Sequence, residues 1–340
     1  MSSVAERELE SFFAASAEQF GAAAGARGLH ERWLRFGPAL LRLRFAGPEL
    51  AAVLLPAFGQ REAPPGHPYA TIDLWADPDG PCPWAFEDIG PGGLVRTGAE
   101  QRVLAVHETA SGALTLVDRE RRALLHRVPG ADAVPWWQRA APLRAGLYWA
   151  LGGERRHLVH AGAVGDERGC ALIPGASGSG KTTVALAALS HGLLYLADDY
   201  VLMDASREPV ALSIYGVAKL DQGHLQRFPT LAAGVRHPPA AEADQKAVLD
   251  VAGLMPDSIR GSLSIRAVIV PRITGGRSHL RPVSSGAAML ALAPSTVLQH
   301  PFGDGSVLTV LGDVVRQVPC YALDVGDDMA ELAAAVKEAL

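Results

Sequence analysis

Hydrophobic and polar residues alternate along much of the first half of the chain, a pattern typical of half-buried β-strands. The alternation is clearest from Val103 to Val128, where three apolar segments are separated by Ser111-Gly112 and by Arg119–Arg122. Short turn sequences between alternating segments predict an antiparallel meander. Further alternating segments at 40–45 and 70–75 extend the β-rich pattern.

The chain begins with a helical pattern, because apolar residues follow Ser3 and Glu6 at helical spacing and this pair fits a capping box. Proline and glycine clusters at 64–68 and 77–83 predict loops. No catalytic signature stands out in this half. We therefore expect a small β-rich N-terminal domain over residues 1–135, and we expect it to recognise a substrate rather than carry out chemistry.

The pattern changes near residue 145. Apolar spacing over Trp136–Leu151 predicts a connecting helix, and from His157 onward strands and helices alternate. An α/β domain over residues 136–340 is the expected fold class. The elements expected in it are strands at 158–164, 170–173, 193–197, 267–270 and 321–325, helices at 181–190, 286–292 and 307–315, and a last helix capped by Asp327 or Asp328.

Composition narrows the class of protein. Hydrophobic residues make up 49% and charged residues 20% of the 340, which excludes a disordered chain. The net charge of −5 gives no general attraction to nucleic acid or to an anionic membrane, and we expect neither as a partner. No stretch resembles a signal peptide or a membrane span, and Cys82, Cys170 and Cys320 are too widely spaced for a disulfide framework. A cytoplasmic location is therefore expected.

One segment carries a complete phosphate-binding motif. Gly175 to Thr183 matches G-x-x-x-x-G-K-[ST], with an apolar strand before it and an amphipathic helix after it. In such a loop the backbone N–H groups converge on phosphate oxygens, the lysine bridges phosphates and the next hydroxyl holds Mg²⁺. The sequence therefore predicts a nucleotide triphosphate and Mg²⁺ as ligands, with Thr182 at the metal. The nucleotide-binding residues are Gly175, Ala176, Ser177, Gly178, Ser179, Gly180, Lys181, Thr182 and Thr183.

Two adjacent carboxylates, Asp198 and Asp199, close the next apolar strand. Two adjacent negative charges at the end of a buried strand destabilise the fold, because they repel each other and lose solvation. A site that binds phosphates and Mg²⁺ would explain both carboxylates. One would neutralise the charge of the metal, and the other would accept a proton from an incoming hydroxyl. A helix cap or a solvated strand end is the alternative interpretation, which the position so soon after the loop disfavours.

The stretch from His160 to Val201 resembles the core of the bacterial HPr kinase/phosphorylase family, whose members show a histidine, a GxSGxGKS loop and an "ADD" strand end at similar spacing. More loosely, residues 136–340 resemble HPr-kinase-related serine kinases. The resemblance implies a P-loop kinase core of the HPr kinase/phosphoenolpyruvate carboxykinase type. It also implies ATP as the phosphoryl donor and a serine hydroxyl of a protein or peptide as the acceptor. By the same resemblance, Asp198 lies at the metal, Asp199 is the general base and His160 lies near the transferred phosphoryl group. The roles of the two aspartates could also be exchanged. A homo-oligomer is compatible with the resemblance.

Three further basic residues are candidates. Arg272 follows a predicted strand and is a candidate for stabilising charge in the transition state, while Lys219 and Lys246 fall where nucleotide or acceptor would be contacted. Lysine is scarce, with Lys181, Lys219, Lys246 and Lys337 as the only four in the chain. For Arg272, Lys219 and Lys246, an ordinary surface role is an equally good interpretation.

The sequence leaves three functions open. The first is a kinase whose acceptor is a serine of a protein or peptide. The second is a small-molecule kinase on the same core, and the third is a regulatory ATPase. The close spacing of the loop and the Asp-Asp pair favours a kinase over a switch ATPase.

Overall fold

The computed structural model describes residues 4–78, 90, 93–95, 102–237, 246–299 and 305–340. The chain divides into two compact units, and the main boundary between them lies between Leu151 and Gly152. The expected boundary lay between residues 135 and 136, whereas in the structure Trp136–Leu151 falls within the first unit. The capping pair at Ser3 and the position of Cys82 lie outside the described residues.

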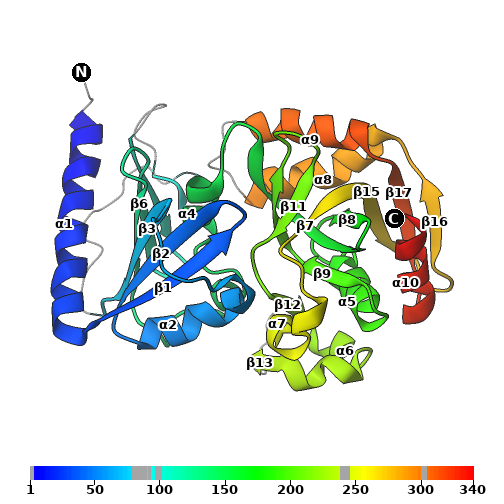
Figure 1. The fold of residues 1–340 in the computed structure, drawn as a ribbon, viewed down its shortest axis with the longest axis horizontal. Helices are drawn as coiled ribbons and strands as arrows, with labels where there is room; N and C mark the ends of the chain where they lie inside the picture. The colour runs from blue at the N-terminus through cyan, green and yellow to red at the C-terminus, as the bar shows by residue number, and fades with distance from the viewer. Residues whose placement is uncertain (1–3, 79–89, 91–92, 96–101, 238–245, 300–304) are drawn as a thin grey trace. The chain divides into compact units, whose positions relative to one another are not determined.

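The first unit is a mixed sheet with helices on both faces. Its six strands have the order β1-β2-β3-β6-β5-β4, and the expected meander is confirmed as the antiparallel strands β4, β5 and β6. The elements (Figure 1) are α1 (Val4–Arg27), β1 (Leu29–Phe36), β2 (Ala39–Ala46), α2 (Glu49–Leu54), the 3₁₀ helix η1 (Leu55–Arg61), β3 (Ala70–Ala76), β4 (Val103–Glu108), β5 (Ala113–Asp118), β6 (Ala123–Val128), α3 (Trp136–Ala140) and α4 (Arg144–Leu151).

The expected helix over Trp136–Leu151 is two helices, α3 and α4. The interruption falls at Pro142, which has no N–H to donate and disfavours helical geometry in the residue before it. Leu143, which follows, has a left-handed backbone with φ of 58°. The chain therefore turns between α3 and α4 instead of continuing as one helix.

Alternating strand residues build two separate cores in the first unit. Leu114 and Leu116 of β5 face α1 and pack with Phe13 and Phe20 of that helix. Thr115 points to the opposite face, where α4 approaches so closely that a Cβ on Gly146 would lie 3.5 Å from the Thr115 methyl group. A hydrogen bond of 2.9 Å joins the Thr115 hydroxyl to Nδ1 of the buried His126.

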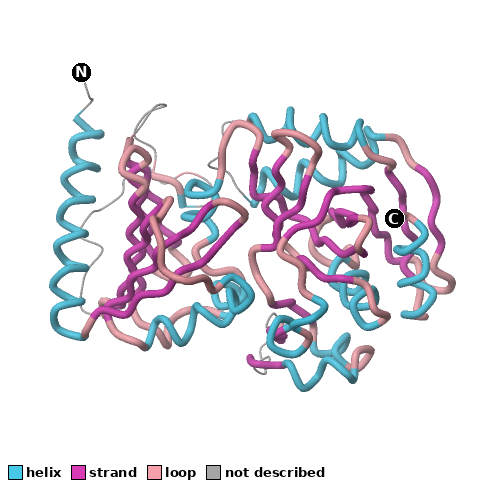
Figure 2. The backbone as a smooth tube through the Cα atoms, in the orientation of Figure 1, coloured by secondary structure: helices cyan, strands magenta, loops and turns pink. Residues whose placement is uncertain are grey.

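The second unit has an α/β/α arrangement around an eight-stranded sheet (Figure 2). Strand order is β11-β10-β7-β8-β15-β17-β16, β9 pairs with β7, and an additional pairing of β11 with β15 closes a ring of strands. The bounds are β7 (Arg156–Asp166), β8 (Gly169–Pro174), α5 (Lys181–Ser190), β9 (Leu194–Ala197), β10 (Tyr200–Asp204), β11 (Val210–Ser213), β15 (Ser262–Ile273), β16 (His279–Pro282), α8 (Ser285–Gln299), α9 (Ser306–Gln317), β17 (Cys320–Val325) and α10 (Met329–Glu338).

Two apolar cores lie on opposite faces of this sheet. Side chains of α5 and α10, such as Leu186 and Leu332, cover one face, and side chains of α8 and α9, such as Leu292 and Leu311, cover the other. The expected last helix is confirmed, with Asp328 as its cap: the carboxylate accepts hydrogen bonds from the backbone of Ala330 and Glu331. The α/β class expected for this part of the chain is observed.

A second, three-stranded antiparallel sheet, which the sequence pattern did not predict, follows β11. Its order is β12-β14-β13, and β12 carries Lys219. The buried Tyr195 of β9 donates a hydrogen bond of 2.9 Å to the Val217 carbonyl and so fixes β12 against the main sheet. The elements are β12 (Val217–Leu220), α6 (Gln222–Leu225), η3 (Pro229–Gly234), β13 (Val235–His237), β14 (Ala247–Asp250), α7 (Val251–Leu254) and η4 (Pro256–Ser258).

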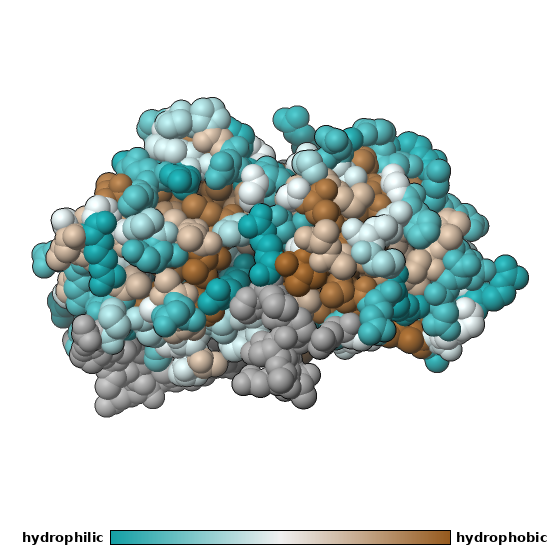
Figure 3. All heavy atoms as spheres, turned by 90° about the horizontal axis from the view of Figure 1, so that it is seen from below, coloured by the Kyte–Doolittle hydropathy of each residue, from teal (hydrophilic) through white to brown (hydrophobic). Residues whose placement is uncertain are grey.

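On the face drawn in Figure 3, hydrophobic residues occur as separate patches among hydrophilic ones. Among the described residues, no helix is long and apolar enough to cross a bilayer.

The buried imidazole of His126 predicts a loss of stability in acid. Burial lowers the pKa of His126 to about 4, whereas the unfolded chain takes up this proton near pH 6.5. The free energy of unfolding should therefore fall as the pH drops through this window, by roughly 3 kcal/mol from this group.

Urea denaturation at pH 7 and at pH 4.5 measures that loss. In a His126→Gln variant the decline between the two pH values should be smaller, whereas His67→Gln, which alters an exposed histidine, should keep the full decline. An unchanged pH dependence in His126→Gln would contradict the assignment.

Candidate functional site

The predicted site residues gather at one edge of the second unit, where β8 ends and β9 gives way to β10. The glycine-rich loop (Gly175–Gly180) joins β8 to α5, which begins at Lys181 as expected. Three loop glycines have left-handed backbones, with φ of 145° at Gly175, 80° at Gly178 and 101° at Gly180. Residues with a side chain rarely adopt these angles, so the sequence allows the loop to curl around its own N–H groups.

The loop is compact on its inner side. A Cβ placed on Gly175 would lie 2.4 Å from the Ser179 hydroxyl oxygen, so any side chain at position 175 would force Ser179 to move. That hydroxyl is buried and has no hydrogen-bond partner among the described residues. An unpaired buried hydroxyl is costly, so a ligand that offers it a partner would be favoured here.

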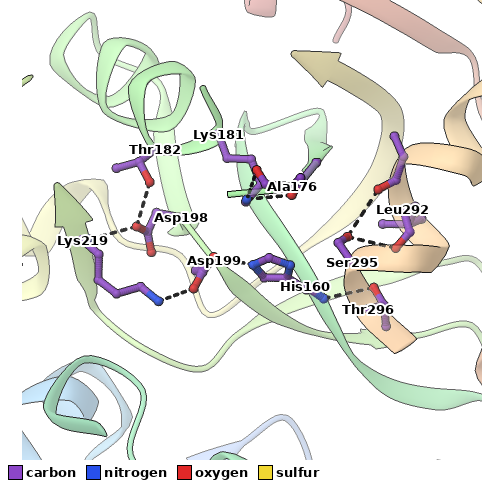
Figure 4. Close-up of polar contacts among 12 residues, drawn as sticks. His160, Ala176, Lys181, Thr182, Asp198, Asp199, Lys219, Leu292, Ser295 and Thr296 are labelled. Carbon is purple, nitrogen blue, oxygen red and sulfur yellow. Dashed lines mark hydrogen bonds and ion pairs between the residues drawn. The ribbon is translucent and has the colours of Figure 1, made fainter. Parts of the chain in front are cut away.

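Lys181 lies across the mouth of this loop. Its ammonium donates hydrogen bonds of 2.7 Å to the Gly175 carbonyl and 3.1 Å to the Ala176 carbonyl (Figure 4). Burial lowers the pKa of Lys181, as do the positive charges of Lys219 and Lys246, while the two aspartates partly offset this. The hydrogen-bond partners of the Lys181 ammonium are both neutral carbonyl groups. Because no carboxylate among the described residues is hydrogen-bonded to it, the ammonium is suited to bind an anionic ligand.

Asp198, which directly follows β9, is hydrogen-bonded to the first turn of α5. Its Oδ2 accepts a hydrogen bond of 3.2 Å from the Thr182 hydroxyl and one of 2.9 Å from the Lys219 backbone N–H. Burial, followed by the neighbouring charge of Asp199, raises the pKa of Asp198 to about 6. A cation at this position would remove that penalty, because it favours the ionised carboxylate.

Asp199 has a different environment, since both of its carboxylate oxygens are engaged. Oδ1 lies 2.7 Å from Nε2 of His160, and Oδ2 forms an ion pair with the Lys219 ammonium. Burial alone would raise the pKa of Asp199, but the charge of Lys219 and the bonds from His160 and Lys219 outweigh it and hold the pKa well below its usual range. Burial alone would lower the pKa of Lys219, but the negative charges of Asp199 and Asp198 raise it.

His160 is fixed by three elements. It lies on β7, and the antiparallel register that pairs Ala161 with Pro174 places it opposite the start of the glycine-rich loop. Its backbone N–H donates a hydrogen bond of 3.2 Å to the buried hydroxyl of Thr296 on α8. The Tyr200 ring packs beside the imidazole, with 5.2 Å between centroids, and the Lys219 ammonium lies 5.4 Å from the centre of the same ring.

The two remaining candidates, Lys246 and Arg272, differ in how they relate to the site. Lys246 lies 3.9 Å from Asp221 and contributes to the positive potential at Lys181. Arg272 is exposed near the end of β15, and no contact among the described residues joins its side chain to the acidic pair. Its neighbour Ile273 reaches the loop, where its side chain would lie 3.4 Å from a Cβ on Gly180. A role for Arg272 stays a prediction.

Sequence reasoning assigned no role to Tyr200 and Thr296. Tyr200 directly follows the acidic pair in the chain, and this position next to Asp199 is the only feature of the sequence that points to a role for it. Thr296 is a polar residue 1% exposed within the predominantly apolar α8, and its partner on β7 is 136 positions away in the chain. No local pattern connects residues so far apart.

The described part of the chain contains no group of three or more His, Cys, Asp or Glu side chains arranged to hold a metal ion. Mg²⁺ at phosphate-binding loops characteristically takes one or two protein ligands, with phosphates and water supplying the others. The Thr182 hydroxyl and the Asp198 carboxylate, already hydrogen-bonded to each other, fit that pattern.

No protein-family model matches this chain, and no curated protein matches its sequence. Among solved structures, the chain is similar to the Hpr(Ser) kinase/phosphatase from Coxiella burnetii, with a TM-score of 0.26 and 10% identity over 50% of this chain and 86% of that chain. A similarity at this level carries no argument about chemistry. The function must be argued from the residues of the site.

The ion pair between Lys219 and Asp199 is largely buried, with 18% and 16% of the two side chains exposed, and it predicts a strong effect on stability. Removing one partner of such a pair leaves a buried charge without compensation, which costs about 3–5 kcal/mol. Lys219→Met should therefore lower the free energy of unfolding by this order in urea denaturation, whereas Lys337→Met, at an exposed position of α10, should change it by less than about 0.5 kcal/mol.

A second variant tests whether the charge is the cause. Asp199→Asn in the Lys219→Met background should recover part of the lost stability, since no uncompensated carboxylate then remains. Additive losses in the double variant would show that the two side chains do not depend on each other.

Proposed function

We propose that this protein is an ATP-dependent kinase that transfers the γ-phosphoryl group of ATP to a serine hydroxyl of a protein or peptide. The observation that carries the proposal is the placement of the glycine-rich loop, with Lys181 and Thr182, next to the buried pair Asp198–Asp199. The first of these features is suited to binding phosphates and a cation, and the second to removing a proton from an incoming hydroxyl.

The residues of the loop fit a nucleotide triphosphate. The glycine backbone angles, the unpaired Ser179 hydroxyl and the Lys181 ammonium all favour an anionic ligand at the start of α5. In the proposal, Gly175–Thr183 holds the phosphates, and Thr182 with Asp198 holds Mg²⁺, which when bound neutralises charge on the phosphates.

Asp199 would serve the acceptor side of the reaction. It is next to Asp198 in the chain but pairs with Lys219 and His160 and not with Thr182. The two carboxylates therefore have separate environments, as expected if one faces a metal and the other a proton donor. Arg272 remains the candidate for stabilising transferred charge, and the N-terminal unit remains the candidate for recognising the acceptor.

A direct search for the acceptor tests the proposal. The full-length protein is incubated with γ-labelled ATP, Mg²⁺ and a lysate of the host, and labelled species are separated by size. A labelled protein or peptide that yields phosphoserine on hydrolysis is the expected result. A labelled small molecule would favour the metabolite kinase, and release of phosphate with no labelled acceptor would favour the regulatory ATPase.

Lys181→Ala should weaken ATP binding. Hydrogen bonds to charged groups are worth about 1.5–3 kcal/mol, so affinity should fall roughly 10- to 100-fold. Equilibrium binding of labelled ATP measures this, with Lys337→Ala as the matched control at an exposed lysine. Equal affinities in the two variants would rule out the assigned role of the loop.

The two aspartates should separate in a magnesium titration. Asp199→Asn should reduce phosphoryl transfer by roughly 10²–10⁴ with ATP binding retained, because the amide cannot support proton removal. Asp198→Asn should instead raise the Mg²⁺ concentration needed for half-maximal activity, since it removes a negative charge beside Thr182. Exchanged phenotypes would keep the kinase and reverse the two assignments.

A further inference from the structure

The hydrogen bonds around Asp199 leave that carboxylate poorly suited to accept a proton directly. One oxygen is bonded to His160 and the other is paired with the Lys219 ammonium, which also lies against the Tyr200 ring. Both carboxylate oxygens are therefore already engaged, and a proton delivered to either one would have to displace His160 or Lys219. The proton acceptor for a substrate hydroxyl is therefore better sought in the group that Asp199 orients.

His160 has one nitrogen engaged and one without a partner. Nε2 lies 2.7 Å from Oδ1 of Asp199, and because an ionised carboxylate only accepts hydrogen bonds, Nε2 carries the hydrogen. Nδ1 is buried and has no hydrogen-bond partner among the described residues. In the neutral tautomer that carries its hydrogen on Nε2, Nδ1 has an open lone pair that can accept a hydrogen bond.

The imidazole is also held in place for contact with a ligand. The residue is 6% exposed, and its backbone N–H is hydrogen-bonded to Thr296. It directly precedes Ala161, which pairs with Pro174 at the end of β8, next to the loop. In Figure 4 the ring lies between the Asp199 carboxylate and Ser295 and Thr296 of α8. A buried acceptor atom without a partner, fixed beside a phosphate-binding loop, calls for a hydrogen-bond donor from the substrate.

We propose that Nδ1 of His160 is the atom that accepts the proton of the acceptor hydroxyl, with Asp199 as the positioning residue that fixes the ring and its tautomer. The inference rests on the proposed kinase function. The hydroxyl oxygen bonds to the γ-phosphorus, the bond from that phosphorus to the β,γ-bridging oxygen breaks, and ADP departs with the electron pair. The hydroxyl proton moves to Nδ1, and the resulting imidazolium is stabilised by Asp199 until it loses the proton to solvent.

The first test needs no turnover. The full-length protein is labelled with ¹⁵N-histidine, and the ring nitrogens of His160 are assigned at neutral pH by the signals that disappear in His160→Gln. We expect a protonated Nε2 and an unprotonated Nδ1, with the pattern altered in Asp199→Asn. A protonated Nδ1, in either the other tautomer or the imidazolium, would overturn the proposal.

The second test uses water as the acceptor and follows release of labelled phosphate from γ-labelled ATP. His160→Gln keeps a polar side chain but cannot take up a proton, so kcat should fall roughly 10²–10⁴ with KM and ATP affinity changed less than about threefold. His191→Gln, at an exposed histidine after α5, should match the unaltered protein. An unchanged kcat in His160→Gln, or a loss confined to KM, would refute the base.

The two tests separate the proposed role of His160 as base from the kinase function on which that role rests. If ATP neither binds nor turns over, the kinase function fails, while the ring nitrogens of His160 still decide whether the dyad exists. If transfer is normal in His160→Gln, the kinase stands and the inference fails. An acid-labile, alkali-stable phosphoryl group on the unaltered protein would make His160 a nucleophile and overturn its role as base.

Discussion

A single charge-balance problem organises the second unit: two consecutive carboxylates are buried at the end of a strand. Such a pair is costly unless each charge finds its own partner. Asp199 finds Lys219 and His160, whereas Asp198 is left with neutral donors from Thr182 and the Lys219 backbone. One carboxylate is therefore satisfied within the protein, and the other retains an elevated pKa of about 6 that a bound cation would relieve.

This asymmetry explains why the small second sheet matters. Strand β12 contributes to both carboxylates from one residue, the Lys219 backbone to Asp198 and its ammonium to Asp199. The Tyr195 hydroxyl secures the strand through the Val217 carbonyl. Removal of this sheet would leave the acidic pair without its main source of positive charge, so the site depends on an element that carries none of the recognised motif.

The same geometry assigns distinct chemistry to neighbouring residues. In the proposed function, Lys181 would bind an anion and Thr182 a cation at the start of α5. Asp199 is hydrogen-bonded to an imidazole whose second nitrogen lacks a partner among the described residues. The proposed binding of phosphate and the proposed removal of a proton would thus depend on different segments, the start of α5 and the strand β7. The proposed kinase follows from that separation.

The sequence by itself determined much of the fold and part of the site. The loop, α5 and the acidic pair are contiguous or close in the chain, and their backbone requirements are local, so glycine spacing and apolar periodicity predicted them. The meander of the first unit and the last helix are local in the same way, although the structure decided that Asp328 and not Asp327 is the cap. Tertiary structure alone decided the rest: that Pro142 divides one helix into two, that Lys219 pairs with Asp199, and that Thr296 reaches His160 across 136 positions. Ion pairs and buried hydrogen bonds depend on which strands become neighbours, and that pairing is set by the whole sheet and not by any segment of it.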